Sequence, residues 1–221
     1  MSLLNPYIRS VAIPRLYRKN DNLLFQGEIP RSVTVIVDGI VKAYTITSDG
    51  EERITAIYGK GDVLPIAWAV GQAPNSLFYY EALNDVRTLQ LTKKEFTKLI
   101  DESHDFRQAI LGILGRNYAG ILLRVTGLVQ SRAIDKISYT LYYLMFRHGI
   151  EKKEGLFTLD VRLSQSTLAD LIGQTRESTA KNLKVLKEKG IIHYSSSIYT
   201  INKSKLENFL GDDSLIEEVF I

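Results

Sequence analysis

Residues 163–190 read LSQSTLADLIGQTRESTAKNLKVLKEKG, and this order of residue types predicts two short helices. Ser164 is a good N-cap for the first helix, and Gly173 supplies the positive φ that ends it. Thr175 then caps a second helix over 176–189. Two helices joined by a three-residue turn that contains glycine are typical of a helix-turn-helix. The apolar face of the second helix is expected to be formed by Ala180, Leu183 and Leu186.

A β-hairpin is expected directly after these two helices. Gly190 ends the second helix, and two apolar, β-branched runs, 191–194 and 198–201, flank a turn of three serines. A helix-turn-helix followed by such a hairpin is a winged helix. In this motif the second helix enters the major groove of DNA, with its first residues facing the base edges.

Basic residues are concentrated in the same part of the chain. The whole chain has a net charge of +3, whereas segment 162–205 alone holds eight basic and three acidic residues, a net charge of +5. Clustered positive charge suits contact with phosphates. A solvated helix face rich in lysine would have the same composition, but the neighbouring helix-turn-helix and hairpin favour double-stranded DNA as the partner.

Side-chain chemistry predicts the roles within this DNA-binding site. Arg176 is expected to make a bidentate contact to guanine, and Glu177 is expected to accept a hydrogen bond from cytosine. Lys181 lies one helical turn after Glu177 and is expected to reach a base or a phosphate. The alternative for this pair is an ordinary ion pair between residues i and i+4. The residues expected to position phosphates are Ser164, Gln165, Thr175, Ser178 and Lys184.

From about Val11 to Leu91 the sequence has the pattern of short β-strands, and helical sequence begins at Thr92. Strands are predicted over 33–37, 40–46 and 53–58, with a hairpin turn at Asp38-Gly39 and a second turn at 48–50. Short strands at this spacing are typical of a small antiparallel barrel or sandwich.

Segment 101–130 is predicted to form one long helix. Its apolar residues recur at spacings of three and four, which is the pattern of a coiled-coil seam. We interpret the seam as a homodimer interface; the alternative is a helix that lies on the core of its own domain. Ile110, Ile113 and Leu122 are expected to cover the barrel. The seam residues are Leu111, Leu114, Tyr118, Ile121, Val125 and Leu128.

Two further features of the helical part complete this interpretation. Gly112 and Gly120 weaken the long helix, yet they permit another helix to approach closely. A helix is predicted over 134–146, and the Glu/Lys-rich segment 149–155 is expected to be a loop.

Composition excludes several classes of protein and site. The chain has no cysteine, which excludes disulfides, cysteine nucleophiles and iron–sulfur clusters held by thiolates. Arg116 and Arg124 interrupt the most apolar run, 111–129, so no membrane span is expected. The N-terminal residues lack the pattern of a signal peptide, and a cytoplasmic location is expected. Catalytic signatures such as a Walker loop, GxSxG or HExxH are missing, and we expect no enzyme activity.

The order of these parts resembles the cyclic-AMP receptor protein/FNR (CRP/FNR) family of bacterial transcription regulators. The matching stretches are FQGE at 25–28, VDG at 37–39, DGE at 49–51, GKGD at 59–62, and REST at 176–179 followed by Lys181. The resemblance implies an α+β fold with an antiparallel β-roll of cyclic-nucleotide-binding type, a dimerisation helix and a winged helix. The implied boundaries are 1–100, 101–131 and 132–221. It also implies a homodimer that reads an inverted repeat, and a contact with RNA polymerase if the protein is an activator.

The sensor part departs from the cyclic-AMP-binding members of this family. Their ribose-binding glutamate aligns with Ile66, and their phosphate-binding Arg-Ser/Thr pair aligns with Ser76-Leu77. A phosphodiester without the arginine loses its main charge-assisted contact, so the sensor domain is interpreted as degenerate. One interpretation of the apolar and aromatic replacements is a pocket for an uncharged or aromatic effector; the alternative is that they fill the barrel. The pocket residues would be Leu64, Ile66, Trp68, Ser76, Leu77 and Tyr79.

No cofactor is identified from the sequence. The three histidines, His104, His148 and His193, do not stand where haem-sensing relatives need a ligand, so haem is not expected. An unidentified small-molecule effector remains compatible with the pattern. The alternative function is a cyclic-nucleotide-responsive binding module that acts mainly through protein contacts.

Overall fold

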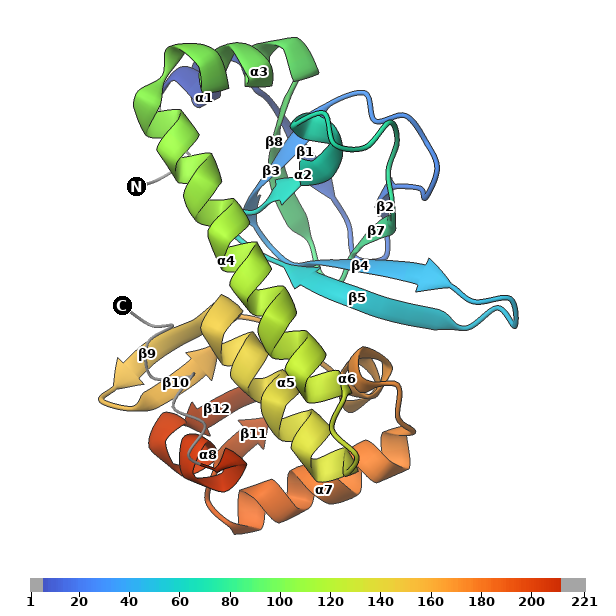
Figure 1. The fold of residues 1–221 in the computed structure, drawn as a ribbon, viewed down its shortest axis with the longest axis vertical. Coiled ribbons are helices and arrows are strands. Elements are labelled where there is room, and N and C mark those ends of the chain that lie inside the picture. The colour runs from blue at the N-terminus through green and yellow to red at the C-terminus, as the bar shows by residue number, and fades with distance from the viewer. Residues whose placement is uncertain (1–5, 212–221) are drawn as a thin grey trace. The chain divides into compact units, whose positions relative to one another are not determined.

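The computed structural model describes residues 6–211, which form eight α-helices and twelve β-strands (Figure 1). The start of the predicted β-roll domain (1–5) and the end of the predicted winged-helix domain (212–221) lie outside these residues. The chain divides into two compact units at Leu114/Gly115, a point within helix α4 (His104–Leu128). Within residues 6–211, no helix is long and apolar enough to cross a membrane.

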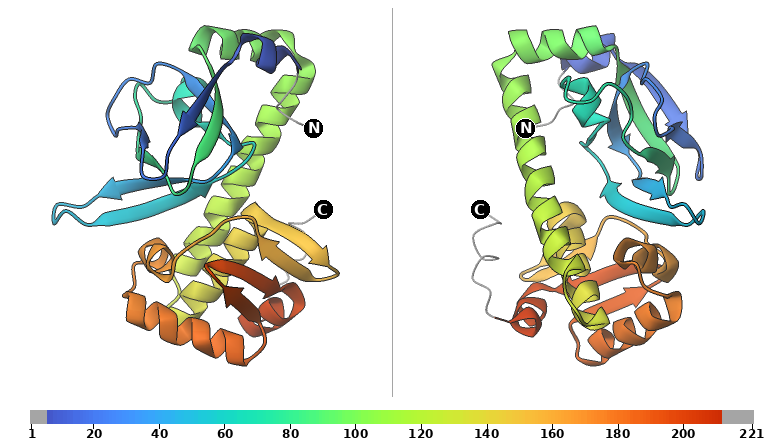
Figure 2. Two further views of the ribbon diagram at one scale, coloured as in Figure 1. Left: turned by 180° about the vertical axis from the view of Figure 1, so that it is seen from behind. Right: turned by 45° about the vertical axis from the view of Figure 1, so that its right-hand side comes forward.

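The N-terminal unit contains two four-stranded antiparallel sheets, which confirms the predicted β-roll architecture (Figure 2). One sheet consists, in spatial order, of β1 (Ile13–Tyr17), β8 (Val86–Leu91), β3 (Val33–Asp38) and β6 (Val63–Leu64). The other consists of β2 (Asn22–Leu24), β7 (Tyr79–Ala82), β4 (Val41–Ile46) and β5 (Glu52–Tyr58). The helices of this unit are α1 (Pro6–Val11), α2 (Ile66–Ala69), α3 (Lys93–Glu102) and the first part of α4.

The predicted hairpin at Asp38-Gly39 is wrong, although both flanking strands exist. β3 pairs with β6 and β8, whereas β4 pairs with β5 and β7, so the turn carries the chain from one sheet to the other. Gly39 has φ +92°, and a Cβ there would clash with the backbone carbonyl oxygen of Asp85. The Ile40 N–H donates to Asn84 Oδ1 (2.7 Å), so a tertiary contact replaces a hairpin bond.

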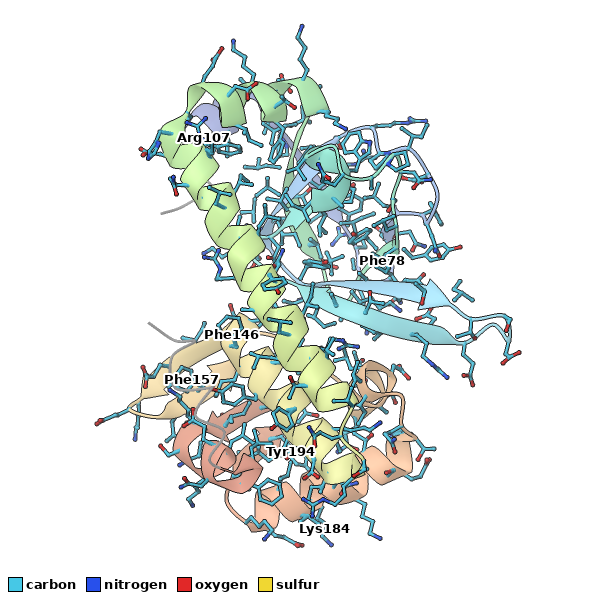
Figure 3. All side chains as sticks on the ribbon, in the orientation of Figure 1. Phe78, Arg107, Phe146, Phe157, Lys184 and Tyr194 are labelled. Carbon is cyan, nitrogen blue, oxygen red and sulfur yellow. The ribbon has the colours of Figure 1, made fainter. Side chains whose placement is uncertain are left out.

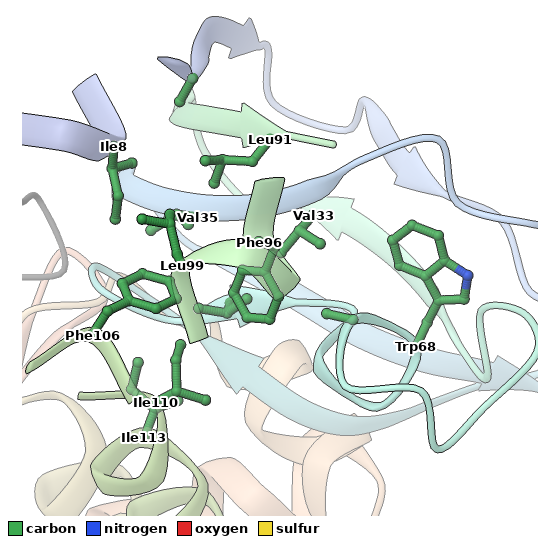
Figure 4. Close-up of a cluster of buried hydrophobic side chains, with 13 residues drawn as sticks. Ile8, Val33, Val35, Trp68, Leu91, Phe96, Leu99, Phe106, Ile110 and Ile113 are labelled. Atoms are coloured by element: carbon green, nitrogen blue, oxygen red, sulfur yellow. The ribbon is translucent and has the colours of Figure 1, made fainter. Parts of the chain in front are cut away.

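Two buried apolar clusters hold the N-terminal unit together. One cluster takes residues from both sheets, among them Ile36, Val41 and Tyr80. The other joins β3, β8 and α2 to helices α1, α3 and α4 and includes Phe96 and Phe106, whose rings meet edge to face at 5.6 Å (Figure 4). Burial of each large aliphatic side chain contributes about 1.5–3 kcal/mol, so these clusters stabilise the unit.

The predicted single helix over 101–130 is wrong at its start, because two helices meet at Ser103. α3 begins with a capping box between Thr92 and Glu95 and ends at Glu102. Ser103 has extended backbone angles, and its hydroxyl accepts the Phe106 N–H at the start of α4 (3.2 Å). The Arg107 guanidinium donates to the Ile100 carbonyl (2.8 Å), which satisfies a group at the end of α3.

The C-terminal unit contains a winged helix. Its helices after α4 are α5 (Ala133–His148), α6 (Gln165–Ile172), α7 (Arg176–Glu188) and α8 (Lys203–Leu210). Its sheet has the order β11 (Ile192–Ser195), β12 (Ile198–Asn202), β10 (Leu156–Leu159), β9 (Gly149–Lys153).

The predicted loop over 149–155 is wrong, because β9 occupies most of it. β9 is an edge strand that pairs with β10, and four of its five residues are exposed. Charged residues on an edge strand prevent pairing with other chains. The Glu/Lys-rich composition therefore suits the edge position. It lacks the alternation of apolar and polar residues by which a strand is predicted from sequence.

Two glycines let α5 pack closely against α4. A Cβ at Gly120 would lie 3.2 Å from Tyr143 Cε2, and one at Gly127 would lie 2.7 Å from Tyr139 Cβ. The prediction of close approach is thus confirmed at Gly120, and the structure adds Gly127. Gly112, the other predicted position, is exposed.

Candidate nucleic-acid interface

The helix-turn-helix is built by local capping interactions. The Ser164 hydroxyl accepts the Thr167 N–H (3.0 Å) and begins α6. Gly173 has φ +62° and its N–H donates to the Ala169 carbonyl, which ends α6 and redirects the chain. The Thr175 hydroxyl then accepts the Ser178 N–H (3.2 Å) and begins α7. These contacts confirm the predicted caps and the predicted turn.

Buried side chains fix α7 against the rest of the unit. Thr179, Leu183 and Leu186 are fully buried on α7, whereas Ala180 is half-buried. The predicted apolar face is thus confirmed at Leu183 and Leu186, and Ala180 is only partly covered. Positions i, i+4 and i+7 of a helix share one face, so Thr179 is in phase with the two leucines. A prediction based on apolar residues alone missed Thr179, because its side chain is polar although it is buried.

The residues predicted to read bases are exposed on α7: Glu177 and Lys181 lie opposite the buried face, and Arg176 lies in the first turn. Arg176, Glu177 and Lys181 are exposed at the start of the helix, and Lys184 follows one turn later. Within the described residues, no ion pair joins Glu177 to Lys181. Both side chains are accordingly available to a ligand.

The residues predicted to position phosphates lie at the starts of α6 and α7. Ser164 and Thr175 are exposed, and Gln165 and Ser178 are half-buried. A hydroxyl that accepts one backbone N–H keeps its O–H donor and a second lone pair, and Ser164 Oγ also lies 2.9 Å from Thr167 Oγ1. A hydroxyl donor beside a helix N-terminus is suited to a phosphate oxygen.

Lysines along α7 divide into two groups. Lys184 Nζ lies 3.9 Å from Glu188 Oε1 on the same helix, a weak exposed ion pair (Figure 3). Lys187 lies over the Tyr194 ring (5.0 Å), and Lys189 lies over the Phe209 ring (5.8 Å). The last two lysines thus contact the hairpin and α8 of their own unit.

The hairpin tip adds residues that the sequence interpretation did not assign to the site. Ser196 and Ser197 have positive φ values of 48° and 66°, as a tight β-turn requires. The Ser197 carbonyl accepts the Leu163 N–H (3.0 Å), which ties the hairpin tip to the segment just before α6. Exposed Ser195 and Ser196 therefore lie near the capped start of the helix-turn-helix. The run of three serines in the sequence was the signal that could have placed this turn in the site.

Arg124 connects α4 to the helix-turn-helix within the C-terminal unit. Its Nη2 donates to the Leu171 carbonyl in the last turn of α6 (2.8 Å). Burial lowers the pKa of Arg124 from its ordinary value. A buried guanidinium at the C-terminal end of α6 also complements the helix dipole.

An apolar stripe on α4 remains exposed. Exposed fractions are 54% for Leu111, 65% for Tyr118, 56% for Ile121 and 50% for Val125. Leu114 and Leu128, the other two seam residues, are half-buried. Of the set expected to cover the barrel, Ile110 and Ile113 are buried, but Leu122 is 50% exposed, so that expectation is wrong for Leu122. Leu122 follows Ile121 and widens the exposed stripe.

The residues predicted to form an effector pocket pack into more than one part of the N-terminal unit. Leu64 belongs to the cluster between the sheets, whereas Trp68 belongs to the cluster beneath α3 and α4. Ser76 is buried and its hydroxyl donates to the Phe78 carbonyl (2.8 Å). Leu77 is 48% exposed, and Tyr79 stacks on Tyr44 (5.1 Å). Ile66 is half-buried against the Trp68 cluster.

Comparison with known proteins identifies the two parts. The family "Cyclic nucleotide-binding domain" matches residues 14–103, and "Crp-like helix-turn-helix domain" matches residues 135–209. The chain belongs to the CRP/FNR family. Together the two matches account for both compact units of this CRP/FNR regulator, in the order that the sequence motifs predicted.

Relatives of this CRP/FNR chain are distant in sequence but match along most of its length. The cyclic AMP receptor protein of Thermus thermophilus is 22% identical, with 87% of this chain and 85% of the relative covered. The fumarate and nitrate reduction regulatory protein of Vibrio cholerae is 24% identical, with 88% and 77% covered. The structure of FixK2 from Bradyrhizobium japonicum has a TM-score of 0.74 at 21% identity, with 90% and 96% covered. FixK2 therefore shares the fold of this regulator.

Proposed function

We propose that this CRP/FNR-type regulator acts as a homodimer whose two α7 helices read an inverted repeat in double-stranded DNA. The observation that carries the proposal is the pair Arg176 and Glu177, exposed on the first turn of a helix whose other face is buried. Arginine discriminates guanine through O6 and N7, and glutamate accepts from cytosine N4. The net charge of +5 over 162–205 supports contact with the phosphates around these bases.

The exposed stripe on α4 supports the dimer. Large apolar side chains that recur at coiled-coil spacing on an otherwise solvated face are typical of a helix pair. A two-fold axis along such a pair relates two α7 helices and matches the symmetry of an inverted repeat.

For the sensor part we propose that cyclic AMP is not the effector. Ile66 and Ser76-Leu77 stand where cyclic-AMP-binding relatives carry the glutamate and the arginine pair. The Ser76 hydroxyl is moreover engaged with a backbone carbonyl. We further propose that the protein acts in the cytoplasm without catalysing a reaction, without a haem or iron–sulfur cofactor, and contacts RNA polymerase if it activates transcription.

Selection of random duplex DNA by the full chain, at near-physiological salt, tests the proposal. We expect enrichment of an inverted repeat. Arg176→Ala is expected to relax the preference at one position of each half-site, at a cost of about 1–3 kcal/mol for the preferred base. Lys153→Ala removes an exposed charge on edge strand β9 and is the matched control, with an unchanged preference.

Two outcomes would count against DNA reading by α7. One is an enriched sequence that Arg176→Ala recognises as well as the parent protein does. The other is no binding of DNA even at low salt, which would favour a module that acts through protein contacts.

A further inference from the structure

An apolar groove opens in the surface of the N-terminal unit, apart from the residues predicted to bind an effector. It lies between the end of α2, the helix α3 and the first turns of α4, and its volume is about 400 Å³. This volume lies in the range of small-molecule sites. The lining residues are Ala69, Val70, Gly71, Lys93, Thr97, Ile100, Arg107, Ile110, Leu111 and Leu114.

The floor of the groove is part of the buried cluster shown in Figure 4. Ala69 and Ile110 are buried members of that cluster, and Val70, Ile100 and Leu114 pack against it. The floor is therefore preformed by packing that the fold needs in any case. Apolar walls of this kind bind water poorly and favour an apolar occupant.

Two cations stand at the groove without a carboxylate partner. Lys93 Nζ lies 4.6 Å from the centroid of the Trp68 ring. Arg107 Nη1 donates to the carbonyls of Ile100 (2.8 Å) and Asp101 (3.4 Å), which leaves other guanidinium donors for a ligand. In the part of the chain that the structure describes, no ion pair engages Lys93 or Arg107, whereas Lys98 on the same α3 pairs with Glu102 (3.9 Å).

We propose that this groove binds a small amphiphilic anion, such as a medium-chain carboxylate. The apolar chain lies against Ala69, Ile110 and Leu114, and the carboxylate accepts charge-assisted hydrogen bonds from Lys93 and Arg107. A cationic or uncharged ligand of the same length does not complement these two side chains. The site lies wholly within the N-terminal unit and does not depend on the proposed reading of DNA. Leu111 and Leu114 also belong to the predicted dimer seam, so one side of the groove is formed by that seam.

Displacement of anilinonaphthalene sulfonate from the full chain tests the proposal without DNA. We expect this fluorescent amphiphilic anion to bind saturably at one site per chain. Decanoate is expected to displace it, whereas decyltrimethylammonium, which has the opposite charge, is not. The absence of saturable binding, or equal displacement by both compounds, overturns the proposal.

Matched variants separate the groove from general charge effects. Lys93→Gln/Arg107→Gln is expected to weaken decanoate binding about tenfold or more, because two charge-assisted hydrogen bonds are lost. Lys94→Gln/Lys98→Gln removes the same charge from exposed positions of α3 outside the groove and is expected to change the affinity less than about twofold. Equal losses in the two double variants contradict the assignment.

A third variant does not depend on the two cations. Thr97 is exposed at the rim, so Thr97→Trp is expected to fill the groove without disturbing the core and to abolish binding. Circular dichroism confirms that each variant is folded before titration. Undiminished binding in the folded Thr97→Trp variant overturns the proposal and leaves the DNA-binding proposal intact.

Discussion

Gly127 shows how a single residue controls the packing of two helices in the C-terminal unit. A Cβ at this position would lie only 2.7 Å from Tyr139 Cβ on α5. We expect Gly127→Ala to lower the free energy of unfolding by about 1–3 kcal/mol, because overpacking outweighs the gain in helix propensity. Gly115→Ala is the control, because a Cβ added at this position of the same helix would have no neighbouring atom within 4 Å. It is expected to be neutral or stabilising. Urea unfolding measures both, and an equal response of the two variants would contradict this account.

Tyr80 provides a second test at the scale of one residue. Burial raises its pKa from 10.0 to about 12, so the folded state favours the neutral phenol. Its contribution to the free energy of unfolding is fully present below about pH 10 and is lost as the pH rises toward about 12. Between about pH 9 and 11 the parent protein is therefore expected to lose about 1 kcal/mol more stability than Tyr80→Phe. Urea unfolding at the two pH values measures this, and parallel losses would disprove the assignment.

Helix α4 is the element on which the dimer depends. Its exposed stripe includes Ile121, and a lysine there would have to leave water if a partner helix covered the stripe. We expect Ile121→Lys to convert a dimer into a monomer in sedimentation equilibrium. Thr126→Lys places the same charge on an exposed position of α4 outside the seam and is expected to leave the dimer intact. If the Ile121→Lys variant remained dimeric, the exposed stripe on α4 would not be the dimer interface.

At the scale of the whole molecule, two winged helices in one dimer must fit the spacing of two half-sites. Half-site centres about 34 Å apart place both major grooves on one face of the duplex. Insertion of about five base pairs between the half-sites rotates them to opposite faces, and we expect the affinity to fall to that of a single half-site. Fluorescence anisotropy measures this, with a duplex that keeps only one half-site as the reference. An affinity that does not change with spacing would contradict the dimeric mode.

The sequence by itself determined the local parts of this protein. Ser164, Gly173 and Thr175 act across three or four residues of chain, so their types alone place the two helices of the motif. The exposed position of Glu177 follows from the buried face of the second helix, and that of Arg176 follows from its place in the first turn. The order of the domains followed from the changes of pattern along the chain, and the resemblance to the CRP/FNR family rested on that order.

Only the tertiary structure decided features that depend on partners distant in the chain. The turn at Gly39 joins two sheets and lies too close to the Asp85 backbone to admit a Cβ, and strand β9 pairs with β10. Thr179 is buried by the helices around it, although its side chain is polar. The groove beside Lys93 and Arg107 brings together residues from α2, α3 and α4. Hydrogen bonding and burial at these places join segments far apart in sequence, where local propensity carries no information.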